Sequence, residues 1–271
     1  MFSIYQYTDN RNRTYHITQA DKKAKFVSDT PIYHLIPSYN SDDYIDYTVK
    51  SFQKQTDKTI VVDNGSSDTT INVLKKHGID PLVILDKGNI STNMNLLLEM
   101  VPKNTWVIWS DADEVLMDLP DNFLRAYADY LYQNKCYCSD VRVVDFIYNY
   151  STLFAGFDWG MGPGNYYTAR RLFYYTGKEK FKNPAHFNIS NTETGDIVEF
   201  NQEHTNEWNG IVMKTHDIQF FHYAKCRGVE RKRQKDNIVT QSQLIDGEAF
   251  AKGIIPTIPY YGKHPSVMEI K

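Results

Sequence analysis

The chain has 271 residues, of which 41% are hydrophobic and 23% are charged, and its formal net charge is −3. This composition is that of an ordinary globular protein and excludes disordered, collagen-like and coiled-coil chains. The small negative charge provides no overall attraction to nucleic acid, so we do not expect a nucleic acid partner.

The sequence also bears on location. No apolar run approaches the roughly 18 residues that a membrane-spanning helix needs, and residues 1–9 lack the pattern of a secretory leader. Cys136, Cys138 and Cys226 do not form a disulfide framework. We therefore expect a cytoplasmic protein without a transmembrane segment, and peripheral contact with a membrane stays open.

Short apolar runs alternate with amphipathic stretches from residue 31 onward. The pattern predicts strands over 32–36, 59–62, 82–85, 105–109 and 141–148, and helices over 42–55, 69–77, 91–100 and 121–134. Strands that alternate with helices in this way predict a mostly parallel sheet covered by helices on both faces. Residues 165–223 are rich in tyrosine and phenylalanine and predict added β-structure. Residues 227–247 predict a helix that opens with a basic cluster, which we interpret as a solvated face or a phosphate contact.

Polar residues cluster where three of these strands end, at 37–40, 63–68 and 110–114. Ligands of open α/β sheets bind beyond the carboxyl ends of the strands, so the three clusters are expected to meet at one site. Asp111 and Asp113 are separated by one residue and follow a buried strand. Together they can hold a hard divalent cation through oxygen ligands, and the cation can hold a diphosphate. The alternative is that they are surface acids or a helix cap.

Three segments resemble the glycosyltransferases of family 2. The segment 60–70 (IVVDNGSSDTT) resembles their strand and Asp-rich turn, 109–114 (WSDADE) their Asp-x-Asp segment, and 35–40 (LIPSYN) their opening strand and loop. The order and spacing agree over roughly residues 31–118. Arg170 to His186 and Phe221-His222-Tyr223 resemble later segments of some members.

The resemblance implies an α/β chain of the GT-A fold, which is a Rossmann-like nucleotide-diphospho-sugar transferase fold. Its mostly parallel sheet is flanked by helices, with a smaller β-rich acceptor part and a C-terminal helix. We accordingly expect an N-terminal extension (1–30), a nucleotide-sugar-binding half (31–118), an acceptor-side half (119–223) and a C-terminal helix and tail (224–271).

The resemblance also assigns residues to the site. Asp63 would contact the nucleobase, while the Asp-x-Asp acids and a late histidine, which His222 matches best, would bind Mn²⁺ or Mg²⁺. The residues expected to bind the nucleotide sugar are Pro37, Ser38, Tyr39, Asp63, Asn93, Asp111, Ala112 and Asp113. For His222, a position in the core between aromatic residues is the alternative interpretation.

Two positions depart from the family pattern. Thr92-Asn93 stands where many members have Arg-Asn, and His186 is followed by phenylalanine where many members have glutamate. The second departure leaves the general base open. Asp158, in a glycine-rich loop, and Glu203 are the first candidates, ahead of Glu207 and Asp217, and each has the alternative of being an ordinary exposed acid.

These observations predict a metal-dependent glycosyltransferase that moves a sugar from a nucleotide diphosphate donor, a UDP-sugar, to a hydroxyl acceptor such as a glycan. The resemblance implies inversion at the anomeric carbon. Two alternatives stay open: a non-catalytic relative that binds nucleotide sugar or glycan, and a nucleotidyltransferase that forms sugar nucleotides.

Overall fold

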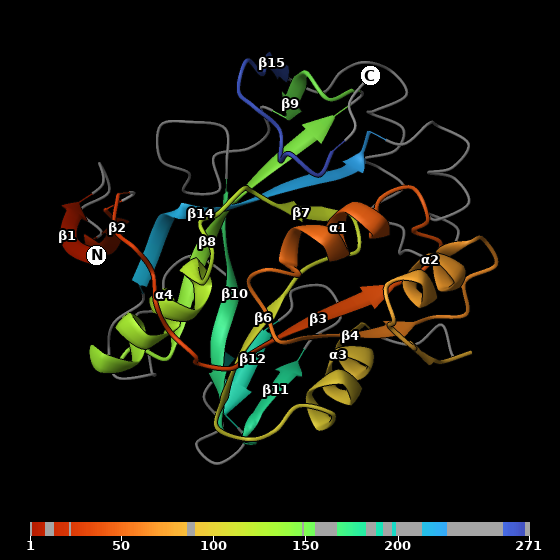
Figure 1. Cartoon of the computed structure of the whole chain (residues 1–271), viewed down its shortest axis with the longest axis horizontal. Coiled ribbons are helices and arrows are strands. Elements are labelled where there is room, and N and C mark those ends of the chain that lie inside the picture. Colours follow the sequence, from red (N-terminus) through yellow and green to blue (C-terminus); the bar gives the residue numbers. More distant parts are fainter. Residues whose placement is uncertain are drawn as a thin grey trace.

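The structure is a computed structural model, and it describes residues 2–8, 14–21, 23–85, 90–147, 149–154, 167–182, 188–191, 197–198, 213–226 and 257–268. In this part of the chain, one mixed sheet dominates (Figure 1). Its strands are β1 (Phe2–Thr8), β2 (Thr14–Ala20), β3 (Ile32–Ser38), β4 (Lys58–Asp63), β5 (Leu82–Val83), β6 (Thr105–Trp109), β7 (Glu114–Leu116), β8 (Cys138–Ile147), β9 (Thr152–Phe154), β10 (Tyr167–Tyr175), β14 (Met213–Lys225) and β15 (Thr257–Pro259).

A separate small sheet contains β11 (Glu179–Lys182), β12 (Asn188–Asn191) and β13 (Ile197–Val198). The helices are α1 (Ile45–Phe52), α2 (Thr70–Lys76), α3 (Ile90–Glu99) and α4 (Phe123–Gln133). The predicted α/β class with a mostly parallel sheet is confirmed. The helices predicted between residues 42 and 134 are present, three with slightly shorter bounds and α3 shifted by one residue.

The main path through the large sheet runs β1-β2-β14-β8-β10-β6-β3-β4-β5. Strands β6, β3, β4 and β5 pair in parallel, as do β2, β14 and β8. Strand β10 lies between the two groups and pairs antiparallel with both β6 and β8. Strands β6 and β8 therefore point the same way, and the carboxyl ends of β3, β4, β6, β8 and β14 face one side of the molecule.

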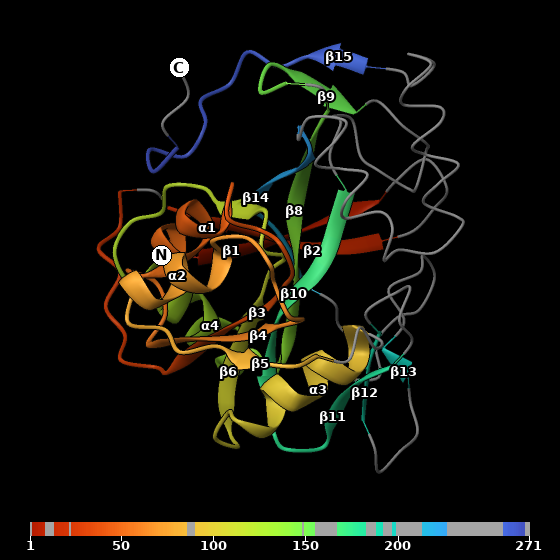
Figure 2. The same cartoon turned by 90° about the vertical axis from the view of Figure 1, so that its right-hand side faces the viewer.

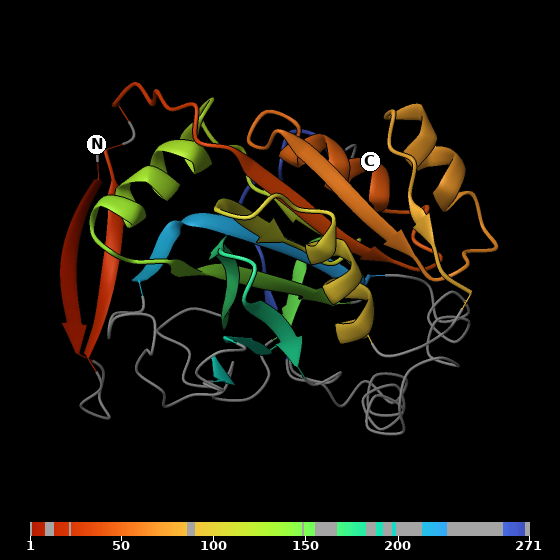
Figure 3. The same ribbon diagram turned by 90° about the horizontal axis from the view of Figure 1, so that it is seen from below.

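Side chains alternate between the two faces along the central strands. Ile36 packs in one cluster with α1 and α2, and Ile108 packs in a neighbouring cluster with α4. Leu35 and Trp109 point the other way and pack with α3. Figure 3 shows α1, α2 and α4 on one side of the sheet and α3 with the small sheet on the other. The helices thus cover both faces, as the sequence predicts.

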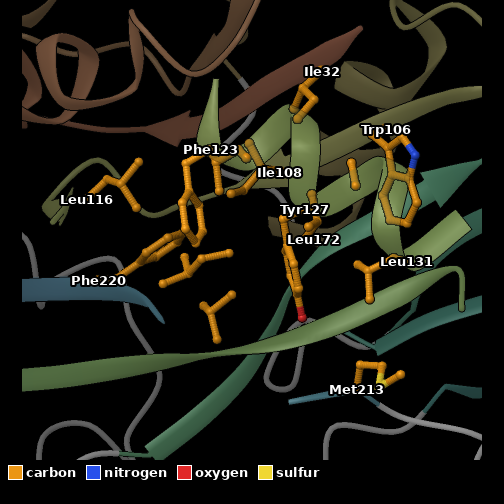
Figure 4. Packing of buried hydrophobic residues seen from close by; sticks show 14 of the residues in the cluster. Ile32, Trp106, Ile108, Leu116, Phe123, Tyr127, Leu131, Leu172, Met213 and Phe220 are labelled. Atoms are coloured by element: carbon orange, nitrogen blue, oxygen red, sulfur yellow. The ribbon is translucent and has the colours of Figure 1, made fainter. Parts of the chain in front are cut away.

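The largest buried cluster lies under α4. Phe123, Tyr127 and Leu131 of this helix face Leu172 of β10 and Phe220 of β14 (Figure 4). This cluster also contains Ile108 and Leu116, so it holds the chain on both sides of the Asp-x-Asp segment.

The N-terminal extension contains two strands of the large sheet. Strands β1 and β2 form an antiparallel hairpin, and β2 pairs in parallel with β14. The hairpin therefore forms one edge of the sheet, opposite β5 (Figure 1). Ile17, Thr18 and Ala20 are buried by this pairing, and such tertiary burial is not visible in the mixed polar sequence of residues 1–30.

Strand β3 also continues past the proline at which the sequence predicts its end. Pro37 pairs with Val62 of β4, whereas the pairing with β6 ends at Leu35. The missing N–H of proline is tolerated because β3 has a single neighbour at that point.

Residues 257–268 lie beside the carboxyl ends of β8 and β14 (Figure 2). Strand β15 pairs with β9, and the backbone N–H and hydroxyl of Ser266 donate hydrogen bonds to Asp118. Within the described ranges, no helix has the length and apolar character required to cross a bilayer.

Candidate functional site

The first two polar clusters are joined at the ends of β3 and β4. The N–H of Asn64 donates to the carbonyl of Ser38 (2.9 Å), and the N–H of Asn40 donates to Ser66 Oγ (2.8 Å). Asn40 has a φ of 44°, a left-handed conformation that asparagine tolerates better than most residues. The turn after β3 is therefore held against the turn after β4.

Asp63 is the buried centre of this region. One of its carboxylate oxygens accepts the N–H of Ser66 and the other accepts the Ser66 hydroxyl, both at 2.7 Å. Gly65 completes the turn with a φ of 76°, which is strained for residues with a side chain. An ionised carboxylate has about four acceptor sites, so these two bonds leave Asp63 able to accept further hydrogen bonds.

The remaining residues expected to bind nucleotide surround this turn. Asn93, near the start of α3, is buried and donates to Asn64 Oδ1 (2.6 Å). Ser38 is buried beside Asp63 in the strand register, and Pro37 and Tyr39 are half-buried. The hydroxyl of Ser38 has no hydrogen-bond partner among the described residues. A buried hydroxyl of this kind is stabilised when a ligand supplies a partner.

The third cluster lies at the end of β6. Ala112 points into the core beneath α1, and its carbonyl accepts the hydroxyl of Thr48 (3.0 Å). Asp111 is 31% exposed, whereas Asp113 is nearly buried. Since Ala112 anchors the turn to α1, the flanking acids project away from the helix.

Asp111 and Asp113 lie beside His222 of β14. Each residue offers one possible ligand atom, a carboxylate oxygen or an imidazole nitrogen, and these three atoms lie within 4.8 Å of one another. The Nε2 atom of His222 is 3.5 Å from Asp113 Oδ1, and the backbone N–H of Tyr223 donates to the Asp113 carbonyl (3.0 Å). The structure thus brings His222 to the Asp-x-Asp acids, and the alternative of a histidine that only fills the core does not describe this position.

Asp145, which the sequence interpretation missed, holds the other side of the imidazole. Its carboxylate accepts the Nδ1–H of His222 in a short hydrogen bond. Burial lowers the pKa of His222, but the charge of Asp145 and the hydrogen bonds to Asp113 and Asp145 outweigh burial and raise it well above its usual value. A single acid in the apolar strand 141–147 is the signal that could have identified Asp145.

Glu114 and Arg171 were also missed as site residues. Glu114 is buried and accepts a hydrogen bond from Arg171 Nη2 at 2.5 Å. Burial raises the pKa of Glu114 to about 7, although the neighbouring charge of Arg171 opposes this rise. Both residues stand in segments that resemble the family, yet nothing in the sequence pairs them.

His34 lies directly below the acidic turn and belongs to the core. Its ring stacks on Phe52, and its Nε2 atom is 2.9 Å from Ser110 Oγ. Burial lowers the pKa of His34 to about 3, so the ring is neutral.

The remaining candidates have other positions. Asp217, one of the candidates for the general base, accepts the N–H of Ala20 (2.6 Å) and ties the hairpin to β14. Tyr260 packs on Phe146 and His264. Asp158, Glu203 and Glu207 lie outside the described residues, as do His186 and the basic cluster of 227–235.

Comparisons with known proteins bear on this geometry. Residues 34–191, more than half of the chain, match the protein family described as Glycosyl transferase family 2. The search of curated proteins found no match.

Among solved structures, S. aureus TarS is 12% identical with a TM-score of 0.47, covering 82% of this chain and 42% of TarS. TarS 1–349 in complex with UDP-GlcNAc is 19% identical with a TM-score of 0.35, and the match covers 50% of this chain and 37% of TarS 1–349. Glucosyl-3-phosphoglycerate synthase from Mycobacterium tuberculosis, in complex with Mn²⁺ and UDP-glucose, is 16% identical with a TM-score of 0.31, covering 44% of each chain. This chain spans less than half the length of each of these structures.

The family match includes most of β3, the Asp63 turn, the Asp-x-Asp turn and Arg171, and it ends before Phe221-His222-Tyr223. The family assignment is therefore confirmed by a finding independent of the site geometry. The chain belongs to glycosyl transferase family 2.

Proposed function

We propose that this protein transfers a sugar from a nucleotide diphosphate donor, a UDP-sugar, to a hydroxyl acceptor such as a glycan, with inversion and with the help of a divalent cation. The observation that carries the proposal is the convergence of Asp111, Asp113 and His222 at the carboxyl edge of the sheet. The Asp63 turn lies along the same edge, so one ligand could contact both regions.

The side chains fit a divalent cation. Two carboxylates and one imidazole suit Mn²⁺, which accepts oxygen and nitrogen ligands, better than Mg²⁺, which prefers oxygen. Asp145 accepts the Nδ1–H of His222 and so leaves Nε2 directed toward Asp113. A carboxylate behind a histidine ligand fixes its tautomer and ring orientation in many metal sites. When bound, the cation would supply Lewis-acid stabilisation of the departing diphosphate.

The residues around Asp63 would bind the nucleoside end of the donor. Asp63 would accept a hydrogen bond from the base, and the buried hydroxyl of Ser38 would gain a partner. The side chain of Asn93 is bonded to Asn64 and would hold that turn in place. Residues 31–118 would then form the donor half and 119–223 the acceptor half, with His222 closing the metal group from the acceptor half.

The acceptor hydroxyl must lose a proton to a general base as its oxygen attacks the anomeric carbon. Asp158 and Glu203 stay our candidates for this role from the sequence. The single displacement inverts the anomeric centre, and the leaving group is the nucleoside diphosphate.

The first test is donor binding, measured by calorimetry on the full chain with Mn²⁺ or with EDTA. UDP-GlcNAc and UDP-glucose are suitable first donors. Asp113→Asn removes the ligand charge, whereas Asp121→Asn removes an exposed charge and is the matched control. We expect Mn²⁺-dependent binding in the wild type and in Asp121→Asn, and a loss in Asp113→Asn.

A second measurement separates transfer from the alternatives. Release of UDP in the presence of a hydroxyl acceptor, with the product anomer identified by NMR, supports inverting transfer. Binding of donors without UDP release against a broad acceptor panel supports a non-catalytic relative. Turnover that requires a nucleoside triphosphate and a sugar phosphate supports a nucleotidyltransferase. Absence of any nucleotide binding by folded protein contradicts both enzymatic functions and leaves only a relative that binds glycan without transfer.

A further inference from the structure

A buried ion pair lies directly behind the proposed cation ligands. Glu114 is fully buried and Arg171 is 4% exposed, and their closest atoms, Oε1 and Nη2, are 2.5 Å apart. The pair joins β7 to β10, two strands that do not pair with each other. Burial of two charges is costly and is not in itself a source of stability, so the position of the pair calls for a reason.

Glu114 closes the Asp-x-Asp turn from both ends. Its Oε2 atom accepts the backbone N–H of Asp111 (2.9 Å), and its own N–H donates to the Asp111 carbonyl (3.1 Å). Both side-chain oxygens are therefore engaged, one with Asp111 and one with Arg171. Since Glu114 is also fully buried behind the turn, it is placed to hold the turn.

The same residue is in register with the third ligand. Strand β7 pairs antiparallel with β14, and Glu114 lies opposite His222. A displacement of Glu114 would move the Asp111 backbone and the β7–β14 pairing together, and so would change the spacing of all three ligands.

Arg171 is fixed from three directions. Its Nη2 atom is 3.8 Å from Asp111 Oδ2 as well as 2.5 Å from Glu114, and its guanidinium carbon lies 3.6 Å from the centre of the Trp109 ring. Trp109 in turn donates its indole N–H to the Arg170 carbonyl (2.9 Å). The guanidinium thus provides a rigid positive charge between two acids of the turn.

We propose that Glu114 and Arg171 act as a positioning pair, which sets the geometry of Asp111, Asp113 and His222 for a divalent cation. This inference rests on the proposed function, because it assumes that the three residues bind the cation. The neighbouring pair Arg170–Asp140 provides an internal comparison. It is also an ion pair of low exposure (3.1 Å) and starts from the same strand, but it does not contact the Asp-x-Asp turn in the described structure.

The test is Mn²⁺ affinity, measured from the EPR signal of free Mn²⁺ in titrations of the full chain without nucleotide. The variants are Glu114→Gln, Arg171→Met and the double variant, with Arg170→Met as the matched control. Loss of groups that orient metal ligands typically weakens metal binding by about 10- to 100-fold. We expect a weakening of that size in both single variants, and affinity near the wild-type value in Arg170→Met.

The double variant guards against misfolding, because it leaves no lone buried charge. Folding is followed by circular dichroism, and the double variant should also bind Mn²⁺ weakly, since the ion pair and the contact of Arg171 with Asp111 are lost. Wild-type affinity in any folded variant that lacks Glu114 or Arg171 overturns the positioning role, as does equal weakening in Arg170→Met. If the wild type itself fails to bind Mn²⁺, the proposed function fails first, so the two failures are distinguishable.

Discussion

His222 Nε2 lies 3.5 Å from Asp113 Oδ1, while its Nδ1–H is held by Asp145. These contacts join β14, the segment after β6, and β8. In the absence of a cation, the two acids favour a protonated imidazole, which is why the pKa of His222 is raised despite its burial. A cation that binds Nε2 must displace this proton.

The first prediction concerns the pH dependence of Mn²⁺ binding. Since His222 has a raised pKa, protons should compete with Mn²⁺ at every pH below that pKa, including the range above about pH 6.5 in which an ordinary histidine is already largely neutral. The affinity should fall by up to about tenfold for each pH unit below the pKa. EPR titrations over a pH series measure this slope.

Asp145→Asn provides the control, because it removes the charge that raises the pKa of His222. The pH-dependent region should move to lower pH in this variant, while the limiting affinity weakens because the imidazole is less well oriented. A wild-type affinity that is constant across the series would contradict the participation of His222.

The second prediction concerns stability without metal. The folded pKa values of His222 and Glu114 are raised, Glu114 to about 7. For each group, the stabilising contribution is present below its unfolded pKa and is lost as the pH rises through its folded pKa. The wild type should therefore lose unfolding free energy relative to Glu114→Gln as the pH rises from about 4.5 to 7. Urea denaturation in EDTA measures the unfolding free energy of both proteins.

Near neutral pH, saturating Mn²⁺ should restore the advantage of the wild type over Glu114→Gln in unfolding free energy. A ligand of the folded state adds stability by mass action, and the wild type binds the cation more tightly. The same urea experiment with Mn²⁺ measures this advantage. If EDTA and Mn²⁺ give identical pH profiles, the acidic turn does not bind the cation.

A third prediction tests the Asp63 turn. Ser66→Ala removes the hydroxyl that donates to Asp63 and accepts from the N–H of Asn40. Loss of about 1 kcal/mol of hydrogen bonding should weaken UDP binding roughly fivefold, since the carboxylate is then less firmly oriented. Ser67→Ala is the control, because exposed Ser67 contacts Asn40 mainly through its backbone N–H. Calorimetry should find near wild-type affinity for Ser67→Ala, and equal losses in both variants would argue against a specific role for Ser66.

The sequence predicted those parts of the molecule in which local pattern and burial agree. The apolar runs ending at Ser38, Asp63 and Trp109 are parallel strands in the core, where hydrophobicity alone identifies them. Gly78 follows α2 with a φ of 70°, as a helix-terminating glycine does. The convergence of three polar clusters also followed from strand direction, because parallel strands share one carboxyl edge.

The partners behind the metal group could not be predicted in the same way. Asp145 meets His222 because β8 and β14 are parallel neighbours in register, and Glu114 of β7 meets Arg171 of β10, a strand with which β7 does not pair. Such pairings depend on sheet order, which no local spacing specifies. The N-terminal hairpin was missed for a related reason, since its burial depends on β14, which is distant in the chain.

The last prediction concerns the anchoring of that hairpin. The hydroxyl of Tyr127 on α4 is hydrogen-bonded to Thr18 of β2 (2.9 Å) and to Ser139 of β8 (2.8 Å), and all three side chains are buried. Tyr127→Phe leaves two buried hydroxyls short of a partner, which should cost about 1–3 kcal/mol of unfolding free energy. Tyr130→Phe, at a half-buried position of the same helix, should cost less than about 0.5 kcal/mol. Urea denaturation measures both values, and equal effects would show that the Tyr127 network does not anchor the hairpin.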